Sequence, residues 1–286
     1  MPVLNVVGAG RLGRSLARLL RCSGAVEVGG VYCRSAAAAQ EAVAFIGGGC
    51  AVATLDALPD AELTLIAVPD GVIGPVASAL ASAVVFRPGS VAFHASGVGE
   101  ASLLVPLAAQ GVRVASVHPA FSFAEPARAV EGFAGTLCAL EGDALACDGL
   151  EPLVRAMGGR PFRLAPGGKA AYHAALSIAS NYLVTLNALA LDVARAGGVG
   201  EALGRELVGR LMQQTLANVL ALGAEAALTG PIARGDVGTL ALHRGCLSPA
   251  QDAAYCALGR LTVALAAPRL AAGAQAQLEH QLQSRE

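Results

Sequence analysis

The sequence predicts an α/β N-terminal domain, built on a Rossmann-like parallel sheet, followed by an all-α C-terminal domain. Two observations support this fold class. A short apolar strand near the start of the 286 residues runs into a glycine-rich turn at residues 8–13, and that turn opens a helix. After Pro166 the β-branched runs stop and only helical periods remain. We therefore expect two domains, residues 1–165 and residues 166–286.

Composition excludes several classes of function. Hydrophobic residues make up 55% of the chain and charged residues 14%, and the formal net charge is −1. Such a surface attracts neither nucleic acid nor an anionic membrane. The seven cysteines contain no Cys-x-x-Cys pair. They are interpreted as small buried hydrophobes in a reducing cytosol, with no disulfide framework and no metal site. No signal peptide is recognisable, so a cytoplasmic protein is expected.

The first strand, Val3–Val7, is followed by the turn Gly8-Ala9-Gly10-Arg11-Leu12-Gly13. This is G-x-G-x-x-G between a strand and a helix, the context that it requires. Gly8 would permit the tight turn, Gly10 would let backbone N–H groups approach a pyrophosphate, and Gly13 would let helix and strand pack closely. The phosphates would lie at the positive end of the helix dipole. The turn therefore predicts a dinucleotide site.

The second strand, Val26–Tyr32, indicates which dinucleotide. A cofactor without a 2′-phosphate is usually bound by Asp or Glu at the end of this strand, and neither is present. Arg34 and Ser35 stand there instead and supply a planar cation and a hydroxyl donor, which suit a 2′-phosphate. This pair favours NADP(H) over NAD(H). The alternative is that Arg34 is simply solvated.

The remaining elements of the α/β domain follow from apolar runs and helical periods. The stretch Ala61–Val68 has the continuous apolar character of a parallel strand that is buried on both faces. Further strands are expected at Cys50–Thr54, Ser90–His94, Val112–His118, Thr136–Leu140 and Pro161–Leu164, with helices at Ala36–Ile46 and Ala144–Met157.

Polar residues follow three of these strands, and ligands of open parallel sheets bind outside the carboxyl ends of strands. The fourth strand ends Val68-Pro69-Asp70, which we expect to line the nicotinamide side together with Ser96. Asp70 could equally cap the helix that follows. His94 and His118 end the fifth and sixth strands. His118 is the stronger site candidate, and either histidine could instead be a structural hydrogen-bonding residue.

The stretch Lys169–Ala196 reads as one long helix after a Pro-Gly-Gly turn. Lys169 is the only lysine of the chain, and no charged residue follows until Asp192. The apolar residues between them predict a largely buried helix. Lysine is seldom buried unless paired, and this chain uses arginine elsewhere, so a compact titratable amine is indicated at this position.

Polar residues of this helix lie in one stripe at about 100° per residue. The stripe contains Lys169, His173, Ser177, Ser180 and Asn187, with Asn181 at its edge. It could face a cleft, substrate or cofactor, or it could bond a neighbouring helix. The run is also long enough to span a bilayer. Its polar residues, and the absence of a basic flank or aromatic belt, favour a core helix at a subunit interface.

Further helices are expected at Glu201–Ala221, Asp236–Arg244 and Pro249–Leu265, with a turn at Leu228–Pro231 and a frayed helix beyond Pro268. Asp236 is expected to cap its helix, with Thr239 and His243 on the same face. Arg234 is the best single candidate to bind a substrate carboxylate. The alternative for Arg234 is an ordinary surface arginine.

Five motifs together resemble a bacterial family that joins a Rossmann-like domain to a helical domain of unknown function, DUF2520. They are AVPD at 67–70, HASG at 94–97, VHPAFSFA at 117–124, GGKAAYHAALSIASNYLV at 167–184 and ALTGPIARGD at 227–236. The family looks like a distant relative of ketopantoate reductase, pyrroline-5-carboxylate reductase and the β-hydroxyacid dehydrogenases. The resemblance implies an NADP-binding Rossmann domain, a helical domain for substrate and dimerisation, and a homodimer.

The resemblance also implies residue roles in an NADP(H)-dependent reductase or dehydrogenase acting on a small carbonyl, hydroxy acid or imine. Lys169 matches the acid/base lysine of the β-hydroxyacid dehydrogenases, and His173 stands where their pattern has asparagine. His173 would relay protons or lower the pKa of the lysine. Ser180 and Asn181 would orient the substrate. Two alternatives remain: a non-enzymatic NADP(H)-binding redox sensor or regulatory module, and an oxidoreductase that exchanges hydride with coenzyme F420.

Overall fold

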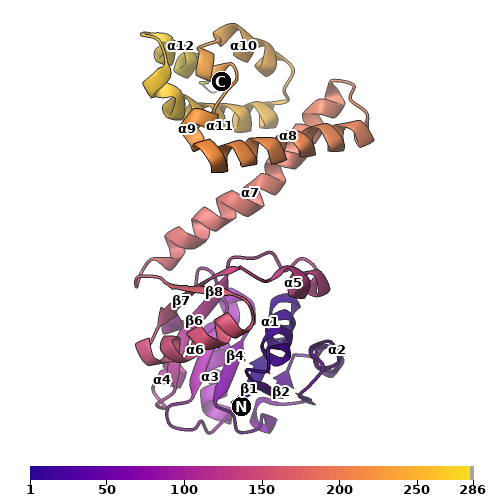
Figure 1. Cartoon of the computed structure of the whole chain (residues 1–286), viewed down its shortest axis with the longest axis vertical. Helices are drawn as coiled ribbons and strands as arrows, with labels where there is room; N and C mark the ends of the chain where they lie inside the picture. Colours follow the sequence, from indigo (N-terminus) through magenta and orange to yellow (C-terminus); the bar gives the residue numbers. More distant parts are fainter. Residues whose placement is uncertain (284–286) are drawn as a thin grey trace. The chain divides into compact units, whose positions relative to one another are not determined.

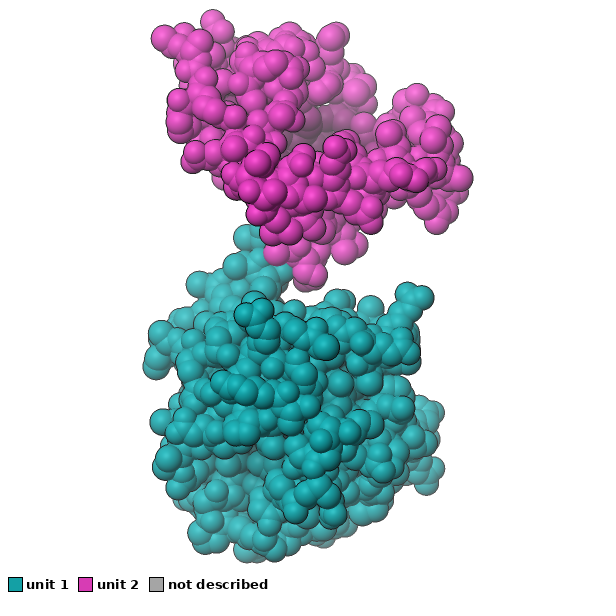
Figure 2. All heavy atoms as spheres, viewed as in Figure 1, with its two compact units in different colours: residues 1–178 teal, residues 179–286 magenta. Residues whose placement is uncertain are grey.

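A computed structural model describes residues 1–283 of the chain and contains an α/β part followed by a helical part (Figure 1). The chain divides into two compact units, Met1–Ile178 and Ala179–Glu286 (Figure 2). The division falls inside helix α7 (Lys169–Ala196), whereas strands give way to helices at the start of α7. The first turns of α7, including Lys169, thus belong to the α/β unit.

The α/β unit is organised around a single sheet with the order β3-β2-β1-β4-β5-β6-β7-β8. Strands β1 to β6 are parallel, β7 is antiparallel to β6, and β8 is parallel to β7. The strands are β1 (Val3–Val7), β2 (Glu27–Tyr32), β3 (Cys50–Val52), β4 (Leu63–Ile66), β5 (Val91–His94), β6 (Arg113–Pro119), β7 (Leu137–Gly142) and β8 (Arg160–Arg163). The first six have the strand order of doubly wound dinucleotide-binding folds, which confirms the predicted fold class.

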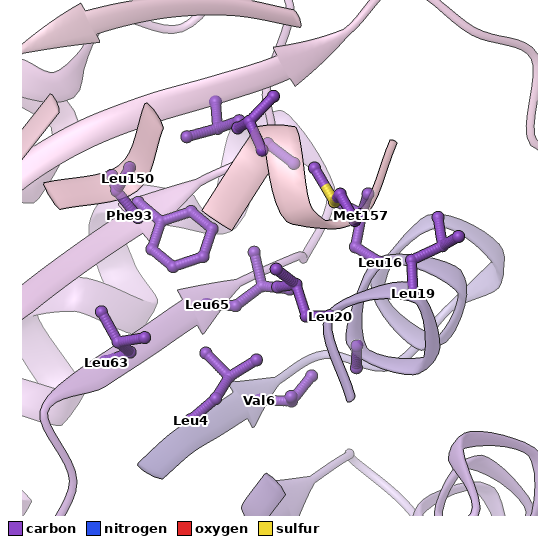
Figure 3. Close-up of a cluster of buried hydrophobic side chains, with 14 of the residues drawn as sticks. Leu4, Val6, Leu16, Leu19, Leu20, Leu63, Leu65, Phe93, Leu150 and Met157 are labelled. Atoms are coloured by element: carbon purple, nitrogen blue, oxygen red, sulfur yellow. The ribbon is translucent and has the colours of Figure 1, made fainter. Parts of the chain in front are cut away.

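Helices cover both faces of this sheet and create two cores. The first core contains residues of α1 (Arg11–Cys22), α2 (Ala36–Ile46), α5 (Pro126–Gly132) and α6 (Ala144–Ala156); the second contains residues of α3 (Ile73–Ala83) and α4 (Val105–Ala108). In β4, Leu63 and Leu65 point into the first core (Figure 3) and Ile66 into the second. Burial on both faces explains the continuous apolar run of this strand. The sequence did not predict α4 and α5.

The helical unit has a smaller core of its own. Its helices are the rest of α7, α8 (Glu201–Leu222), α9 (Ala224–Ala227), α10 (Val237–Gly245), α11 (Pro249–Ala266) and α12 (Ala274–Gln281). Short 3-10 helices are η1 (Leu55–Ala57), η2 (Asp70–Val72), η3 (Ala101–Leu104), η4 (Ile232–Arg234) and η5 (Ala267–Arg269). Leu278 and Leu282 are fully buried against residues of α10 and α11. The helix predicted beyond Pro268 is present, but over residues 274–283 it is not frayed, because these leucines anchor it.

Two predictions of burial were also wrong for the single chain. Lys169 is the only residue of α7 that is buried, and Tyr182 and Val184 are 60% and 70% exposed. An apolar helix is buried only where other elements cover it, and the described chain covers this one only in part, leaving its remaining residues half-buried or exposed. By length and composition α7 could cross a bilayer, although one such helix is weak evidence of a membrane protein. Among the cysteines, Cys22, Cys50 and Cys246 are exposed.

Candidate functional site

The glycine turn between β1 and α1 has the geometry that its sequence predicts. Gly8 has φ 85°, and a Cβ there would lie 2.6 Å from Val68 Cγ1. A Cβ on Gly13 would lie 2.4 Å from the carbonyl oxygen of Gly8, so a side chain at either position would displace the turn. Gly10 faces open space and is the N-cap of α1, with no side-chain cap and no acidic residue in the first turn. Backbone N–H groups of a first helical turn that have no side-chain cap, with room beside them, suit a pyrophosphate.

The other residues of the turn do not block this space. Ala9 is buried, Leu12 is half-buried and Arg11 is exposed. At the end of β2, Arg34 and Ser35 are both exposed. The Ser35 hydroxyl oxygen accepts a hydrogen bond from the backbone N–H of Ala38 at 3.1 Å and so caps α2. Its own proton stays available to a ligand, because a hydroxyl both donates and accepts.

The loop after β4 brings one carboxylate towards the site. Val68 is half-buried, and Pro69 and Asp70 are exposed. Asp70 begins η2, and the N-cap of the following helix α3 is Val72, so Asp70 does not cap that helix. Burial lowers the pKa values of His94, His118 and Lys169, and the negative charge of Asp70 opposes this lowering.

His94, at the end of β5, uses both ring nitrogens inside the protein. The backbone N–H of Ser96 donates to Nδ1 at 3.2 Å, and Nε2 donates to the carbonyl oxygen of Glu100 at 3.0 Å. A backbone N–H can only donate and a carbonyl can only accept, so these partners define a neutral tautomer. Burial lowers the pKa of His94 to about 4, and its side chain is inaccessible. His94 therefore shapes the loop from Ser96 to Glu100 and has no ring nitrogen left for a ligand.

Lys169 lies at the centre of a buried polar chain. Its ammonium donates to the carbonyl oxygen of Ser96 at 2.6 Å and to the Ser116 hydroxyl oxygen at 2.8 Å. The Ser116 hydroxyl donates to Glu141 Oε2 at 3.2 Å, and the same oxygen accepts from the backbone N–H of Ala101 at 2.8 Å. The lysine side chain is 1% exposed. Burial lowers its pKa to about 8, against the opposing effect of nearby carboxylates, of which Glu141 acts most strongly.

His118, Tyr172 and His173 form a second group, less buried than Lys169. His118 Nδ1 lies 3.0 Å from the Tyr172 hydroxyl oxygen, and the two rings meet edge to face. The His173 ring centroid lies 6.0 Å from that of His118. A Cβ on Gly97 would lie 2.9 Å from His118 Nε2 and 3.0 Å from His173 Nε2. Both imidazole Nε2 atoms therefore converge on the backbone of Gly97.

The α/β unit thus brings together Ser96, His118, Lys169 and His173, while Ser180 and Asn181 fall in the other unit and are exposed. Asn187 donates to Met212 Sδ at 3.5 Å, a contact with a neighbouring helix. Sequence patterns did not point to three residues of the site: Ser116, Glu141 and Tyr172. For Glu141 a signal was available, because it is an acidic residue inside the apolar stretch Leu137–Gly142.

The helical unit contains features of its own. Asp236 caps α10 as predicted, accepting from the backbone N–H of Thr239 at 3.0 Å. His243 Nδ1 lies 2.9 Å from the Tyr255 hydroxyl oxygen. An open apolar cavity of about 730 Å³ is lined mainly by residues of α7 and α11, among them Leu189 and Leu258.

Comparisons with known proteins match two different family models to the two halves of the chain, and the second match begins inside the α/β unit, before strand β7. A family model described as a Rossmann-like domain matches residues 3–119, and one described as a domain of unknown function, DUF2520, matches residues 136–262. No curated protein matches the chain. Among solved structures, protein TM1727 from Thermotoga maritima is similar at 29% identity and a TM-score of 0.65, over 84% of this chain and 88% of that one.

Two further structures share the fold at lower identity. A candidate NADP oxidoreductase, BF3122 from Bacteroides fragilis, has 19% identity and a TM-score of 0.73 over 93% of this chain and 97% of its own. An imine reductase from Pseudomonas sp. has 17% identity and a TM-score of 0.65 over 99% of each chain. The protein therefore carries a Rossmann-like domain followed by a domain of the DUF2520 family.

Proposed function

We propose that the protein is an NADP(H)-dependent oxidoreductase that transfers a hydride to or from a small carbonyl, hydroxy acid or imine. The observation that carries this proposal is the open glycine turn at the start of α1, in the same unit as the polar group at the ends of β5 and β6. The fold shared with a candidate NADP oxidoreductase and an imine reductase supports the same reaction class.

The cofactor would be bound by groups that the structure leaves accessible. The backbone N–H groups of residues 10–13 would bind the pyrophosphate, and Arg34 with Ser35 would bind the 2′-phosphate. Val68 and Pro69 would lie on the nicotinamide side, as would Ser96, which is itself buried. When bound, the cofactor supplies or accepts the hydride. The residues of the protein must orient the substrate, exclude water and supply or remove a proton.

Lys169 is proposed as the general acid/base of the site. With a pKa of about 8, its ammonium can both lose and regain a proton near neutral pH, which is the condition for efficient proton transfer. Such a group contributes about 10²–10⁴-fold to the rate. Because the amine is enclosed by Ser96 and Ser116, we propose that it acts through hydrogen bonds of the site. His173, one helical turn away, is the accessible group next to it. Ser180 and Asn181 remain proposed substrate-orienting residues.

A homodimer and a cytoplasmic location belong to the same proposal. Helix α7 exposes Tyr182, Leu183 and Val184, and the helical unit also contains the apolar cavity. Exposed apolar surface of this extent marks an interaction site, and a second copy of the chain is the proposed partner.

Light scattering after gel filtration should give twice the chain mass, and Leu183→Asp should give a monomer. The control Val85→Asp changes an exposed valine of the α/β unit and should leave the dimer intact. A monomeric wild-type protein, or one that needs detergent, would contradict this.

The first experiment is a titration with NADPH and, separately, with NADH, followed by nicotinamide fluorescence. Tight NADPH binding with weak NADH binding supports the cofactor assignment. A panel of small carbonyls, hydroxy acids and cyclic imines then tests turnover, with reduced coenzyme F420 as a further hydride donor. Binding of neither nucleotide would overturn the proposal. Binding without turnover of any substrate would favour a redox sensor or regulatory module.

A further inference from the structure

The two histidines at neighbouring strand ends differ in what their ring nitrogens can do. His94 has a backbone partner at each nitrogen, and its side chain is inaccessible. His118 has one side-chain partner, the Tyr172 hydroxyl at Nδ1, and its Nε2 lies beside the backbone of Gly97. Of the two, only His118 can therefore present a ring nitrogen to a ligand at the carboxyl ends of the strands.

The hydrogen bond between Tyr172 and His118 determines which nitrogen carries the proton. A phenol is a stronger acid than a neutral imidazole N–H, and an imidazole nitrogen is a stronger acceptor than a phenol oxygen. The favoured arrangement is donation from the Tyr172 hydroxyl to Nδ1, which leaves the ring proton on Nε2. Burial raises the pKa of Tyr172 to about 12, so the phenol keeps its proton at neutral pH. Phe162, edge-on at 6.1 Å between ring centroids, packs against the phenol.

We propose that Tyr172 is a positioning residue, which donates to Nδ1 of His118 so that a neutral imidazole presents its Nε2–H to the reacting oxygen or nitrogen of the substrate. The inference rests on the proposed function and adds to it the group that polarises the substrate. No proton leaves His118 in this role; it only donates a hydrogen bond. Proton supply stays with Lys169.

The charges around His118 are consistent with a neutral donor. Lys169 and His173 face it from α7, and Asp70 faces it from η2. Burial lowers the pKa of His118 to about 4, the positive charge of Lys169 acts in the same direction, and the carboxylate of Asp70 opposes both. At neutral pH the ring is therefore uncharged. A neutral imidazole can polarise a carbonyl or imine through its N–H and leaves the cationic role to the lysine.

The test is ¹⁵N NMR of the histidine rings in the full-length protein, with His118 assigned by its loss in His118→Asn. The wild-type spectrum should show His118 protonated at Nε2 and unprotonated at Nδ1 between pH 6 and 8. In Tyr172→Phe, His118 should become a mixture of tautomers, because no donor then holds Nδ1 unprotonated. A wild-type ring protonated at Nδ1, or a Tyr172→Phe spectrum unchanged at His118, would overturn the inference.

The helical unit supplies a matched control. The pair His243 and Tyr255 has the same atoms in contact at 2.9 Å and the same edge-to-face rings. Tyr255→Phe should change the tautomer of His243 and leave the His118 signals in place. A change at His118 in this variant would mean that the effect is not local to Tyr172.

Kinetics provide a second, independent readout. Tyr172→Phe should lower kcat/KM by up to about 10²-fold, the cost of one badly presented hydrogen-bond donor, and leave NADPH affinity unchanged. If Tyr172 were purely structural, its replacement would change the stability of the protein and leave the tautomer of His118 unchanged. If the protein binds no NADPH, the proposed function fails, while the NMR result still decides the role of Tyr172.

Discussion

The ammonium of Lys169 donates to the Ser116 hydroxyl at 2.8 Å, and this contact joins the only lysine of the chain to the middle of strand β6. Through Ser116 the lysine reaches Glu141 in β7. The first turn of α7 is thereby held on the sheet by a buried cation and a buried carboxylate. The two charges are linked through the Ser116 hydroxyl, so removing either one interrupts a buried hydrogen-bond chain.

Lys169→Met should therefore have two separable effects. It should abolish turnover and leave NADPH binding intact, and it should destabilise the protein by about 1–3 kcal/mol, because the oxygens of Ser96 and Ser116 lose their donor and Glu141 loses the positive charge that reaches it through Ser116. The double variant Lys169→Met with Glu141→Gln should recover much of the stability and none of the activity. Urea unfolding and single-turnover kinetics measure the two effects. Recovery of activity in the double variant would show that the lysine is structural only.

Gly10→Ala tests whether the glycine turn binds the cofactor, without disturbing how the turn folds. A Cβ on Gly10 meets no atom within 4 Å, so stability should stay nearly unchanged, whereas the methyl group should occupy space meant for a pyrophosphate. NADPH affinity should fall at least about 10-fold, which corresponds to about 1.4 kcal/mol. Gly74→Ala is the control, because a Cβ there is equally unobstructed and lies in α3. Equal losses of affinity in both variants would argue against the assignment of the turn.

Arg34→Ala tests the preference for NADP(H). Loss of a charge-assisted hydrogen bond costs about 1.5–3 kcal/mol, so the Kd for NADPH should rise about 10–150-fold and the Kd for NADH should hardly change. Fluorescence titration with both nucleotides measures the difference. Arg195→Ala, in an exposed pair with Asp192, is the matched control and should change neither Kd. If Arg34→Ala weakened the binding of NADPH and NADH equally, Arg34 would not be the residue that binds the 2′-phosphate.

His94 makes stability depend on pH. Its folded-state pKa of about 4 lies below the ordinary value of 6.5, so between these values the unfolded chain binds more protons than the folded one. Stability should consequently fall as the pH drops from 6.5 to 4, by up to roughly 3 kcal/mol from this residue. Urea unfolding at pH 4.5 and pH 7 should show a smaller difference in His94→Gln. His280→Gln, which alters an exposed histidine, should behave like the wild type.

Local sequence predicted the fold well because the relevant signals are local. The glycine turn requires a positive φ at Gly8 and close packing at Gly13, and no other residue satisfies both. Helix α2 begins and ends at the predicted residues, because Ser35 caps its start and Gly47 takes the left-handed conformation at its end. The continuous apolar run of β4 likewise predicted a strand buried on both faces, and Leu65 and Ile66 enter opposite cores.

The sequence by itself therefore predicted the succession of the strands and of most helices along the chain and the glycine turn of a dinucleotide site. It also singled out Lys169 as a residue with a special role. The tertiary structure alone decided the roles of residues far apart in sequence. It placed Ser116 and Glu141 against Lys169, tied both nitrogens of His94 to backbone atoms, and left one nitrogen of His118 free. Hydrogen-bond partners and burial depend on which strand ends meet at one edge of the sheet, and sequence spacing does not contain that information. The predicted burial of α7 was wrong for the same reason. An apolar sequence shows that a helix is suited to burial, but it does not show which element packs against it.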